Sequence, residues 1–240
     1  MNILITGGVS GLGKAITKKL AMEFTGKTVY ATYHSSQSAA KELEQEFNNV
    51  KGIHCDFTSA ESVSSLLNQL ESLQLEIVIN NALTGIEQKH FHKIPASFFI
   101  QSFQNNIMPA IQIAQILIPY FRKQKSGRFI NILSSYVIGA PPLGMSEYVA
   151  AKCYLNSLSN SWAAENAKYN ISSNCLSPTI MRTGLTKETD DRIFEEIEAA
   201  SLLKRLLTIE ETAEAVYSLC NASAKVNGKN IEVSAGEKWI

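Results

Sequence analysis

Tyr148 and Lys152 are the residues whose types and spacing point most directly to chemistry. They lie four positions apart in the segment SEYVAAK, and residues i and i+4 share one face of a helix. An ammonium group beside a phenol favours tyrosinate, so it lowers the tyrosine pKa from its ordinary value of about 10. A phenol tuned in this way can donate or accept a proton near neutral pH. The pair therefore predicts a general acid or base on a helix.

A glycine-rich turn follows the first expected strand. Residues 6–13 read TGGVSGLG, and a helical pattern begins at once. Gly7, Gly11 and Gly13 allow a tight turn, a close approach of backbone to ligand, and close packing of helix on strand. The N-terminus of the helix then presents free N–H groups and a positive dipole to a phosphate. We predict a dinucleotide-phosphate site here, although the G-x3-G-x-G spacing differs from the GxGxxG of larger dehydrogenases.

The segment after the second expected strand bears on which cofactor is bound. It reads ATYHSS over 31–36 and contains no Asp or Glu. An enzyme that selects NAD usually places a carboxylate here for the adenosine ribose 2′-OH, and that charge repels a 2′-phosphate. Thr32 takes this position, while His34 and Ser35 can donate hydrogen bonds to phosphate. The segment favours NADP(H), with NAD(H) as the alternative.

With further short motifs, these residues resemble the short-chain dehydrogenase/reductase family, in its single-domain branch. TGGVSGLG is similar to the family's TGxxxGxG loop, INNA over 79–82 is similar to its NNAG, and SEYVAAK holds its Tyr and Lys. Asp56, Asn106, Pro178 and Thr183 match markers after the third strand, on a helix, and after the sixth strand. The motifs occur in the family's order, and the resemblance covers essentially the whole chain.

The resemblance implies a catalytic set. Tyr148 is the expected general acid in carbonyl reduction and the general base in alcohol oxidation. Lys152 is expected to bind the nicotinamide ribose and to lower the Tyr148 pKa, and Asn106 to hold a water of a proton relay. A serine is expected to hydrogen-bond the substrate oxygen and stabilise the charge that develops there. Counting back 13 positions from Tyr148 gives Ser135, which we predict, whereas counting along the preceding strand gives Ser134.

The resemblance also implies a cofactor site built mainly from residues that follow strand ends. The expected cofactor-binding residues are Gly7, Ser10, Gly11, Leu12, Gly13, Thr32, His34, Ser35, Asp56, Phe57, Asn80, Asn81, Ala82, Tyr148, Lys152, Pro178, Met181 and Thr183. Two positions depart from the family pattern. Leu83 replaces the last Gly of NNAG, and Thr179 replaces the Gly of a Pro-Gly pair, so we expect the loops beside the pocket to differ.

These expectations lead to an NADP(H)-dependent oxidoreductase that interconverts a carbonyl and a secondary alcohol, in which the cofactor carries the hydride. The resemblance implies 3-oxoacyl thioesters, also when bound to an acyl carrier protein, as the first substrate class. The alternative is a non-catalytic cofactor-binding or sensor protein, because fold alone cannot separate the two. A sensor has no need to keep the whole catalytic set, so its presence favours the enzyme. No metal is expected.

Strand-like and helix-like segments alternate along the chain and would position these residues. The expected strands cover 2–6, 27–33, 51–55, 75–80, 128–134, 171–176 and 229–233, and the expected helices cover 12–24, 37–47, 60–72, 96–124, 147–168 and 209–221. This alternation predicts a doubly wound, mostly parallel, seven-stranded sheet with helices on both faces, a Rossmann fold. We expect one domain over 1–240. An insertion near 182–204 is expected to be a substrate lid or a plain solvated helix.

Composition and length exclude several classes. The 22 Lys and Arg balance the 22 Asp and Glu, so no basic excess exists to neutralise a nucleic-acid backbone. No apolar run approaches the roughly 18 residues of a membrane helix, and the N-terminus lacks a signal-peptide pattern. Cys55, Cys153, Cys175 and Cys220 form no CxxC pair. They read as buried thiols in a reducing compartment, which predicts the cytoplasm.

Two clusters invite other interpretations. His90 and His92 in KHFHK have no evident third ligand beyond Glu87, so a polar surface loop is favoured over a metal site. The four basic residues between 122 and 128 end a helix, where cations suit the dipole; a docking patch for an acidic acyl carrier protein is the alternative. From the resemblance and two long apolar-rich helices we expect a homodimer or homotetramer.

Overall fold

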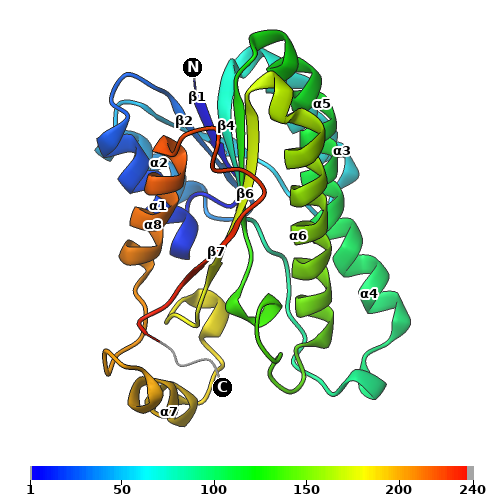
Figure 1. The fold of residues 1–240 in the computed structure, drawn as a ribbon, viewed down its shortest axis with the longest axis vertical. Coiled ribbons are helices and arrows are strands. Elements are labelled where there is room, and N and C mark those ends of the chain that lie inside the picture. Colours follow the sequence, from blue (N-terminus) through cyan, green and yellow to red (C-terminus); the bar gives the residue numbers. More distant parts are fainter. Residues whose placement is uncertain (1, 237–240) are drawn as a thin grey trace.

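A seven-stranded sheet forms the centre of the computed structural model, which describes residues 2–236 (Figure 1). The strands are β1 (Asn2–Ile5), β2 (Val29–Tyr33), β3 (Val50–His54), β4 (Leu75–Asn80), β5 (Gly127–Ile132), β6 (Ile171–Pro178) and β7 (Asn230–Val233). Every neighbouring pair is parallel, in the order β3-β2-β1-β4-β5-β6-β7. The predicted fold class, a doubly wound parallel sheet in one domain, is confirmed.

Helices cover both faces of this sheet. One face carries α1 (Gly11–Glu23), α2 (Gln37–Glu46) and α8 (Ile209–Asn221), and the other carries α3 (Ala60–Gln69), α5 (Met108–Gln124) and α6 (Ser146–Asn166). Short 3-10 turns cover Leu70–Leu73, Phe91–Lys93, Ser135–Val137, Ala167–Tyr169 and Gly184–Thr186. Within residues 2–236, no helix is long and apolar enough to cross a membrane.

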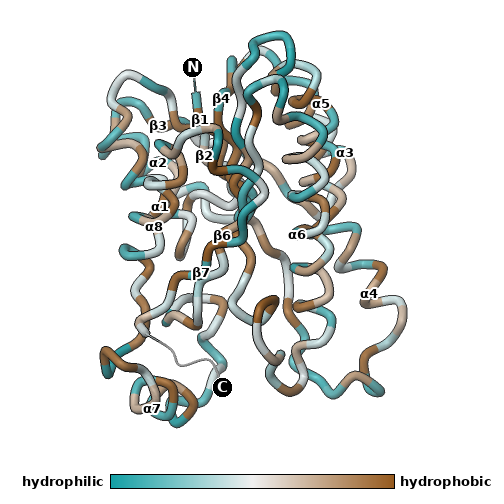
Figure 2. The backbone as a smooth tube through the Cα atoms, viewed as in Figure 1, coloured by the Kyte–Doolittle hydropathy of each residue, from teal (hydrophilic) through white to brown (hydrophobic). Residues whose placement is uncertain are grey.

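The alternation of side chains along each strand creates two apolar cores. Ile3 and Ile5 pack toward α1 and α8, whereas Leu4 packs toward α3 and α5, because successive strand residues point to opposite faces. Figure 2 shows the hydrophobic residues concentrated along the strands and hydrophilic ones on the outer turns. Burial on both faces explains why the central strands are nearly continuous apolar runs.

The strand order reverses between β1 and β4. From β1 the chain builds outward to β2 and β3, and from β4 it builds the other way to β7. In sheets of this kind, ligands bind outside the carboxyl ends of the strands at the reversal. The turn after β1 and the loops after β4 and β5 therefore define where the site must lie.

The single helix expected over 96–124 is wrong in detail. It consists of α4 (Ala96–Ser102), a π-helical turn (Phe103–Ile107) and α5. Pro109 lies in the first turn of α5 and has no N–H to donate to the preceding turn. The Asn106 side chain bonds instead to the loop after β4. Such π turns often mark functional sites.

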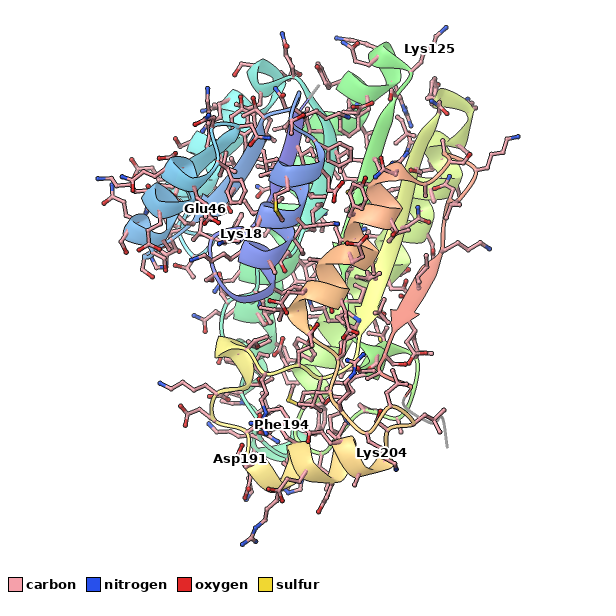
Figure 3. The ribbon with its side chains drawn as sticks, turned by 90° about the vertical axis from the view of Figure 1, so that its left-hand side faces the viewer. Lys18, Glu46, Lys125, Asp191, Phe194 and Lys204 are labelled. Carbon is pink, nitrogen blue, oxygen red and sulfur yellow. The ribbon has the colours of Figure 1, made fainter. Side chains whose placement is uncertain are left out.

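The insertion near 182–204 contains α7 (Asp191–Ala200), which lies at the lower end of the molecule in Figure 1. Asp190 caps the helix by accepting a hydrogen bond from Arg192 N at 2.9 Å. Phe194 is the buried residue of α7, and the Arg182 guanidinium lies 4.1 Å from the centre of its ring. Figure 3 shows α7 at the end of the molecule opposite Lys125.

Candidate functional site

The turn between β1 and α1 has the shape of a phosphate site. Gly7 and Gly11 adopt φ values of +63° and +47°, which favour glycine. A Cβ on Gly13 would lie 1.9 Å from Gly7 O, so the helix packs on the turn only with glycine there. At Gly11 nothing lies within 4 Å of where a Cβ would be. The start of α1 is therefore open to an approaching ligand, with Ser10 exposed beside it.

The end of β4 holds this turn in place. Thr6 Oγ1 accepts hydrogen bonds from Asn81 N (2.9 Å) and Ala82 N (3.0 Å). The Asn81 side chain donates to Gly7 O at 3.1 Å. Asn81 and Ala82, which were predicted as cofactor contacts, thus join the two strands at the reversal point. A nicotinamide dinucleotide fits a turn that is fixed in this way and open at its glycines.

The adenosine end of the expected cofactor site differs from the sequence prediction at Thr32. Thr32 is fully buried, and its hydroxyl accepts a hydrogen bond from Gly7 N at 2.9 Å. Thr32 therefore stabilises the glycine turn through its hydroxyl. His34 and Ser35 are exposed at this rim, and His34 Nε2 lies 3.4 Å from Asp56 Oδ2. Hydrogen bonds from Thr58 hold the pKa of Asp56 below its ordinary value, with a smaller contribution from His34.

Tyr148 lies in the first turn of α6, next to the end of β5. Ser134 is the side chain whose hydrogen bonding lowers the pKa of the Tyr148 hydroxyl, whereas the spacing in the sequence favours Ser135. Ser134 is the extended residue that follows β5, and its Oγ also accepts from Tyr136 N at 3.3 Å. Ser135 begins the 3-10 turn, where its carbonyl accepts from Ile138 N at 2.9 Å. The geometry thus favours Ser134 as the serine of the site.

The pKa of Tyr148 also departs from expectation. Burial raises it to about 12, and the hydrogen bond with Ser134 offsets only part of that rise. The predicted lowering by Lys152 is not what the structure shows, because desolvation of the phenolate outweighs the effect of the neighbours. Tyr148 is therefore a neutral phenol at physiological pH, which is the form that donates a proton.

Lys152 is buried beneath Tyr148, one turn further along α6. Its Nζ donates to Ile132 O at 2.8 Å and lies 5.7 Å from the centre of the Tyr148 ring. Burial lowers the Lys152 pKa from 10.5 to about 8. The ammonium is therefore still the main form at pH 7, but it is held in its charged form at a cost to stability.

This cost leads to a prediction about how the stability of the protein depends on pH. Between pH 8 and 10.5 the unfolded chain binds the Lys152 proton more tightly than the native protein does. The free energy of unfolding therefore increases through this residue as pH rises. We expect Lys152→Met to increase the free energy of unfolding at pH 7, by about 1–3 kcal/mol. The gain over wild type should shrink at pH 10. Urea denaturation of both proteins at pH 7 and pH 10 measures the difference in their free energies of unfolding. An equal difference at the two pH values would contradict the prediction.

A small cavity separates Lys152 from Asn106. It has a volume of about 20 Å³, and its walls include Thr6, Asn80, Asn106 and Lys152, so it is large enough for one water molecule. Asn80 is buried and donates to Asn131 Oδ1 at 2.7 Å. Its own Oδ1 has no hydrogen-bond partner among the described residues. A polar wall of this kind suits a water better than an apolar group.

Asn106 belongs to a hydrogen-bonded chain that the sequence did not reveal. Its Oδ1 accepts from Thr84 N (2.7 Å) and Thr84 Oγ1 (3.0 Å), and its Nδ2 donates to Ser102 Oγ (3.1 Å). Ser102 in turn hydrogen-bonds Glu147, a buried carboxyl whose pKa is raised by burial. Glu147 directly precedes Tyr148, so this chain ties α6 to the π turn and to the loop after Leu83. A glutamate within the SEYVAAK motif was the available signal.

The remaining predicted contacts lie around the rim of the site or behind it. Phe57 forms part of the wall of the small cavity, and Leu12 packs beside Met181. Met181 is buried and accepts a hydrogen bond from Thr212 through its sulfur. Pro178 ends β6, and Thr183 caps the turn at Gly184–Thr186. No hydrogen bond within residues 2–236 joins these residues to Tyr148.

The basic residues between 122 and 128 lie at the end of α5 and the start of β5. Arg128 starts β5 and donates to the carbonyls of Leu219 and Cys220, and Arg122 donates to Asn166 Oδ1 at 2.7 Å. The cluster therefore lies at the amino end of β5, and Figure 3 shows Lys125 at the end of the molecule opposite α7. These contacts engage Arg122 and Arg128 within the fold, and the alternative of a docking patch for an acidic acyl carrier protein stays a prediction.

Two smaller predictions can also be compared with the structure. Cys55, Cys175 and Cys220 are buried, but Cys153 is exposed, so the expectation of four buried thiols is wrong at that position. The rings of His90 and His92 stack 6.1 Å apart. Among the described residues, no group of three or more His, Cys, Asp and Glu side chains could hold a metal.

Comparisons with known proteins identify the family of the chain. The family model for short chain dehydrogenases matches residues 1–193. A tropinone reductase homolog of Arabidopsis thaliana is 30% identical, with 98% of this chain and 90% of that protein covered. A 3-oxoacyl-[acyl-carrier-protein] reductase of Aquifex aeolicus is 29% identical, with 97% and 95% covered.

A solved structure of a short chain dehydrogenase/reductase family protein matches with a TM-score of 0.85 and 27% identity, with 98% of this chain and 96% of that chain covered. The match spans the sheet, both helical layers and the site between them. From its fold, its site and these relatives, the chain belongs to the short-chain dehydrogenase/reductase family of nicotinamide-dependent oxidoreductases.

Proposed function

We propose that this protein reduces a ketone to a secondary alcohol with NADPH, and that Ser134, Tyr148 and Lys152 form its catalytic centre. The observation that carries the proposal is the placement of Tyr148 and Lys152 one turn apart on α6, with Lys152 Nζ buried 5.7 Å from the centre of the Tyr148 ring and bonded to Ile132 O at the end of β5. Ser134 adds the side chain that lowers the Tyr148 pKa. The bound cofactor would supply the hydride. The protein's own part is to orient the ketone, donate a proton and exclude water.

The two hydroxyls of Ser134 and Tyr148 would hold the ketone oxygen between them. Both can donate a hydrogen bond to that oxygen as negative charge develops on it, which stabilises the transition state. Tyr148 then transfers its proton, and its pKa of about 12 guarantees that the proton is present at neutral pH. The Lys152 ammonium stabilises the tyrosinate that remains and leaves N–H groups for the cofactor ribose.

Tyr148 must then regain a proton. The cavity of about 20 Å³ touches both Lys152 and Asn106, and we propose that a water there links the lysine to the π turn. Asn80 Oδ1 would accept one of the hydrogen bonds of that water, and the chain from Thr84 to Glu147 would fix the Asn106 backbone. The role of Asn106 is thus to position the water and not to contact the ketone.

The proposed preference for NADPH rests on His34 now that Thr32 is known to be buried. The loop after β2 carries no carboxylate that would repel a 2′-phosphate, and exposed His34 and Ser35 can donate to it. Asp56, 3.4 Å from His34, opposes this attraction, so we expect a modest preference for NADPH in kcat/KM. His34→Ala should bring the two cofactors closer to equality. A preference for NADH of tenfold or more in the wild type would contradict the proposal.

A panel of carbonyl compounds tests the proposed activity. Ketones, ketosugars and 3-oxoacyl thioesters would be supplied with NADPH and with NADH, and loss of absorbance at the reduced cofactor's band would be followed. We expect turnover with at least one class. The similarity to 3-oxoacyl-[acyl-carrier-protein] reductases puts 3-oxoacyl thioesters, free or carrier-bound, first. A protein that binds NADPH tightly but oxidises it with no member of the panel would instead be a cofactor sensor.

We also propose that the segment over 182–204 covers the bound substrate. Leu185, Ile193, Leu202 and Leu203 are apolar side chains that it exposes. They lie in and around α7, at the end of the molecule where β5 and β6 end (Figure 1). An apolar cover would exclude water from the transferred proton and hydride.

A homodimer or homotetramer is the proposed assembly, in the cytoplasm. Phe91, Ile100 and Tyr154 are exposed apolar or aromatic side chains on or next to α4 and α6, and a two-fold contact would cover them on both copies. Light scattering at micromolar concentration should therefore give at least twice the 26.4 kDa chain mass. A clean monomer would contradict this assembly.

A further inference from the structure

The KHFHK segment over 89–93 lines a second, larger cavity outside the catalytic centre. This cavity has a volume of about 410 Å³ and lies between the loop after β4 and the loop after β5. Its lining residues are Gln88, Lys89, His90, Lys93, Leu143 and Gly144. The two loops run side by side at the lower end of the molecule, ahead of α4 and α6 (Figure 1).

The wall of this cavity is held by backbone contacts. Lys89 N donates to Gly144 O at 3.1 Å, which joins the two loops directly. Gly144 has φ +82°, and a Cβ there would lie 3.2 Å from both Gln88 Cγ and Lys89 N. Only glycine allows this approach without strain. The cavity is therefore a feature of two loops fixed against each other.

The cavity lies close to the catalytic tyrosine. Gly144 precedes Tyr148 by four residues, and four residues span at most about 14 Å of chain. A small molecule whose carbonyl lies between Ser134 and Tyr148 could therefore place a second group beside Gly144. Leu143, which is 81% exposed, would contact the part of the molecule between the two groups.

The titratable side chains that line the cavity are all bases. Lys89 pairs with Glu87, whose carboxylate lies 3.0 Å from its Nζ. Lys93 is exposed, and it makes no ion pair within the described residues. The side chains of Lys93, His90 and Gln88 can all donate hydrogen bonds. A cavity with several donors and an uncompensated ammonium suits a carboxylate or phosphate group.

We propose that this cavity binds an anionic group of the substrate, so that the enzyme acts on ketones that carry a carboxylate or phosphate a short distance from the carbonyl. This inference rests on the proposed function, because it places the carbonyl at Tyr148. It extends that function by naming the charged end of the substrate. Lys93 is the specificity-determining residue, and it takes no part in the proton transfer.

Binding without turnover tests the proposal separately from the activity. Titration calorimetry with NADP⁺ present would compare 5-oxohexanoate, 7-oxooctanoate and 9-oxodecanoate with their methyl esters. For phosphate, dihydroxyacetone phosphate would be compared with dihydroxyacetone. We expect one length of acid, or the phosphate, to bind more tightly than its neutral partner by about fivefold or more. The better of the two pairs identifies the anion, and the difference should shrink at high salt.

Three variants locate the effect. Lys93→Gln should remove most of the preference for the anion and leave the neutral compound within about twofold. Glu87→Gln should increase the preference, because it releases Lys89 from its ion pair. Lys123→Gln removes the same charge from the exposed end of α5, near Lys125 at the opposite end of the molecule, and should change neither.

The outcomes separate the two proposals. Anions that bind no better than their neutral partners, or that do not bind at all, would overturn the anion site. An equal loss in Lys93→Gln and Lys123→Gln would also overturn it, because the effect would then come from net charge. Anion binding at Lys93 with no oxidation of NADPH by any ketone would support the cavity and contradict the proposed reduction.

Discussion

Tyr148→Phe should lower the turnover of carbonyl reduction by at least about 10²-fold, the scale of general acid catalysis. The substitution removes the phenolic O–H but leaves the ring, which is partly buried at the start of α6. Without that proton the developing alkoxide is neutralised only by water, which reaches the site poorly. Steady-state rates with the best ketone measure the loss, and titration with NADPH should show that cofactor affinity is kept.

Tyr154→Phe provides the matched control for this loss. Tyr154 lies on the same helix, is 45% exposed, and packs edge-on against Phe103 at 5.1 Å. Removing its hydroxyl leaves that ring contact intact, so the rate should be unchanged. A Tyr148→Phe enzyme with a near-normal rate on its true substrate would mean that another group donates the proton.

The second large effect concerns the choice between adjacent serines. Ser134→Ala should lower kcat by about 10- to 100-fold, because it removes one of two donors to the ketone oxygen. Ser135→Ala makes the same chemical change one residue later and should cost less than about threefold. Ser134 follows β5 in extended conformation and bonds Tyr148, whereas Ser135 has already turned into the 3-10 segment. Parallel kinetics of the two variants decide between them.

Loss of folding could imitate the effect of Ser134→Ala, because Ser134 Oγ also accepts from Tyr136 N. Ser134→Thr retains a hydroxyl at the same place and should recover part of the rate. Thermal unfolding and cofactor binding should be similar in all three variants. The opposite order, with Ser135→Ala inactive and Ser134→Ala active, would restore the assignment favoured by the sequence.

Much of the fold could be predicted from the sequence because the residue pattern of each segment suits its place in the parallel sheet. Segments such as 75–80 are apolar on both faces, which only a covered parallel strand explains. Gly7 and Gly13 are required by one turn geometry. Apart from the helix expected over 96–124, the boundaries differ by at most three residues, as expected for frayed ends. The single helix predicted over 96–124 failed because the apolar period continues through the π turn, while Pro109 and the side-chain bonds of Asn106 break the backbone pattern.

The site was less predictable, for reasons that lie in its three-dimensional packing. The spacing of Ser135 from Tyr148 does not tell which serine is the last extended residue before the 3-10 turn that follows β5. Thr32 was predicted as a cofactor contact because the end of β2 often provides one, yet its hydroxyl bonds Gly7 N. The pKa of Tyr148 depends on burial, which outweighs the opposite effect of Ser134. Glu147 received no role from the sequence, and the structure places its buried carboxyl beside Ser102.

Direct transfer of deuterium tests most sharply whether Ser134, Tyr148 and Lys152 form a carbonyl-reducing centre. NADPH labelled with deuterium at the reactive C4 position would be incubated with the best ketone, and the alcohol would be examined by mass spectrometry and NMR. We predict one deuterium on the former carbonyl carbon with wild type, and formation slowed by at least about 10²-fold with Tyr148→Phe. An alcohol without deuterium at that carbon when either C4 hydrogen is labelled, or equal rates for the two proteins, would contradict the assigned centre.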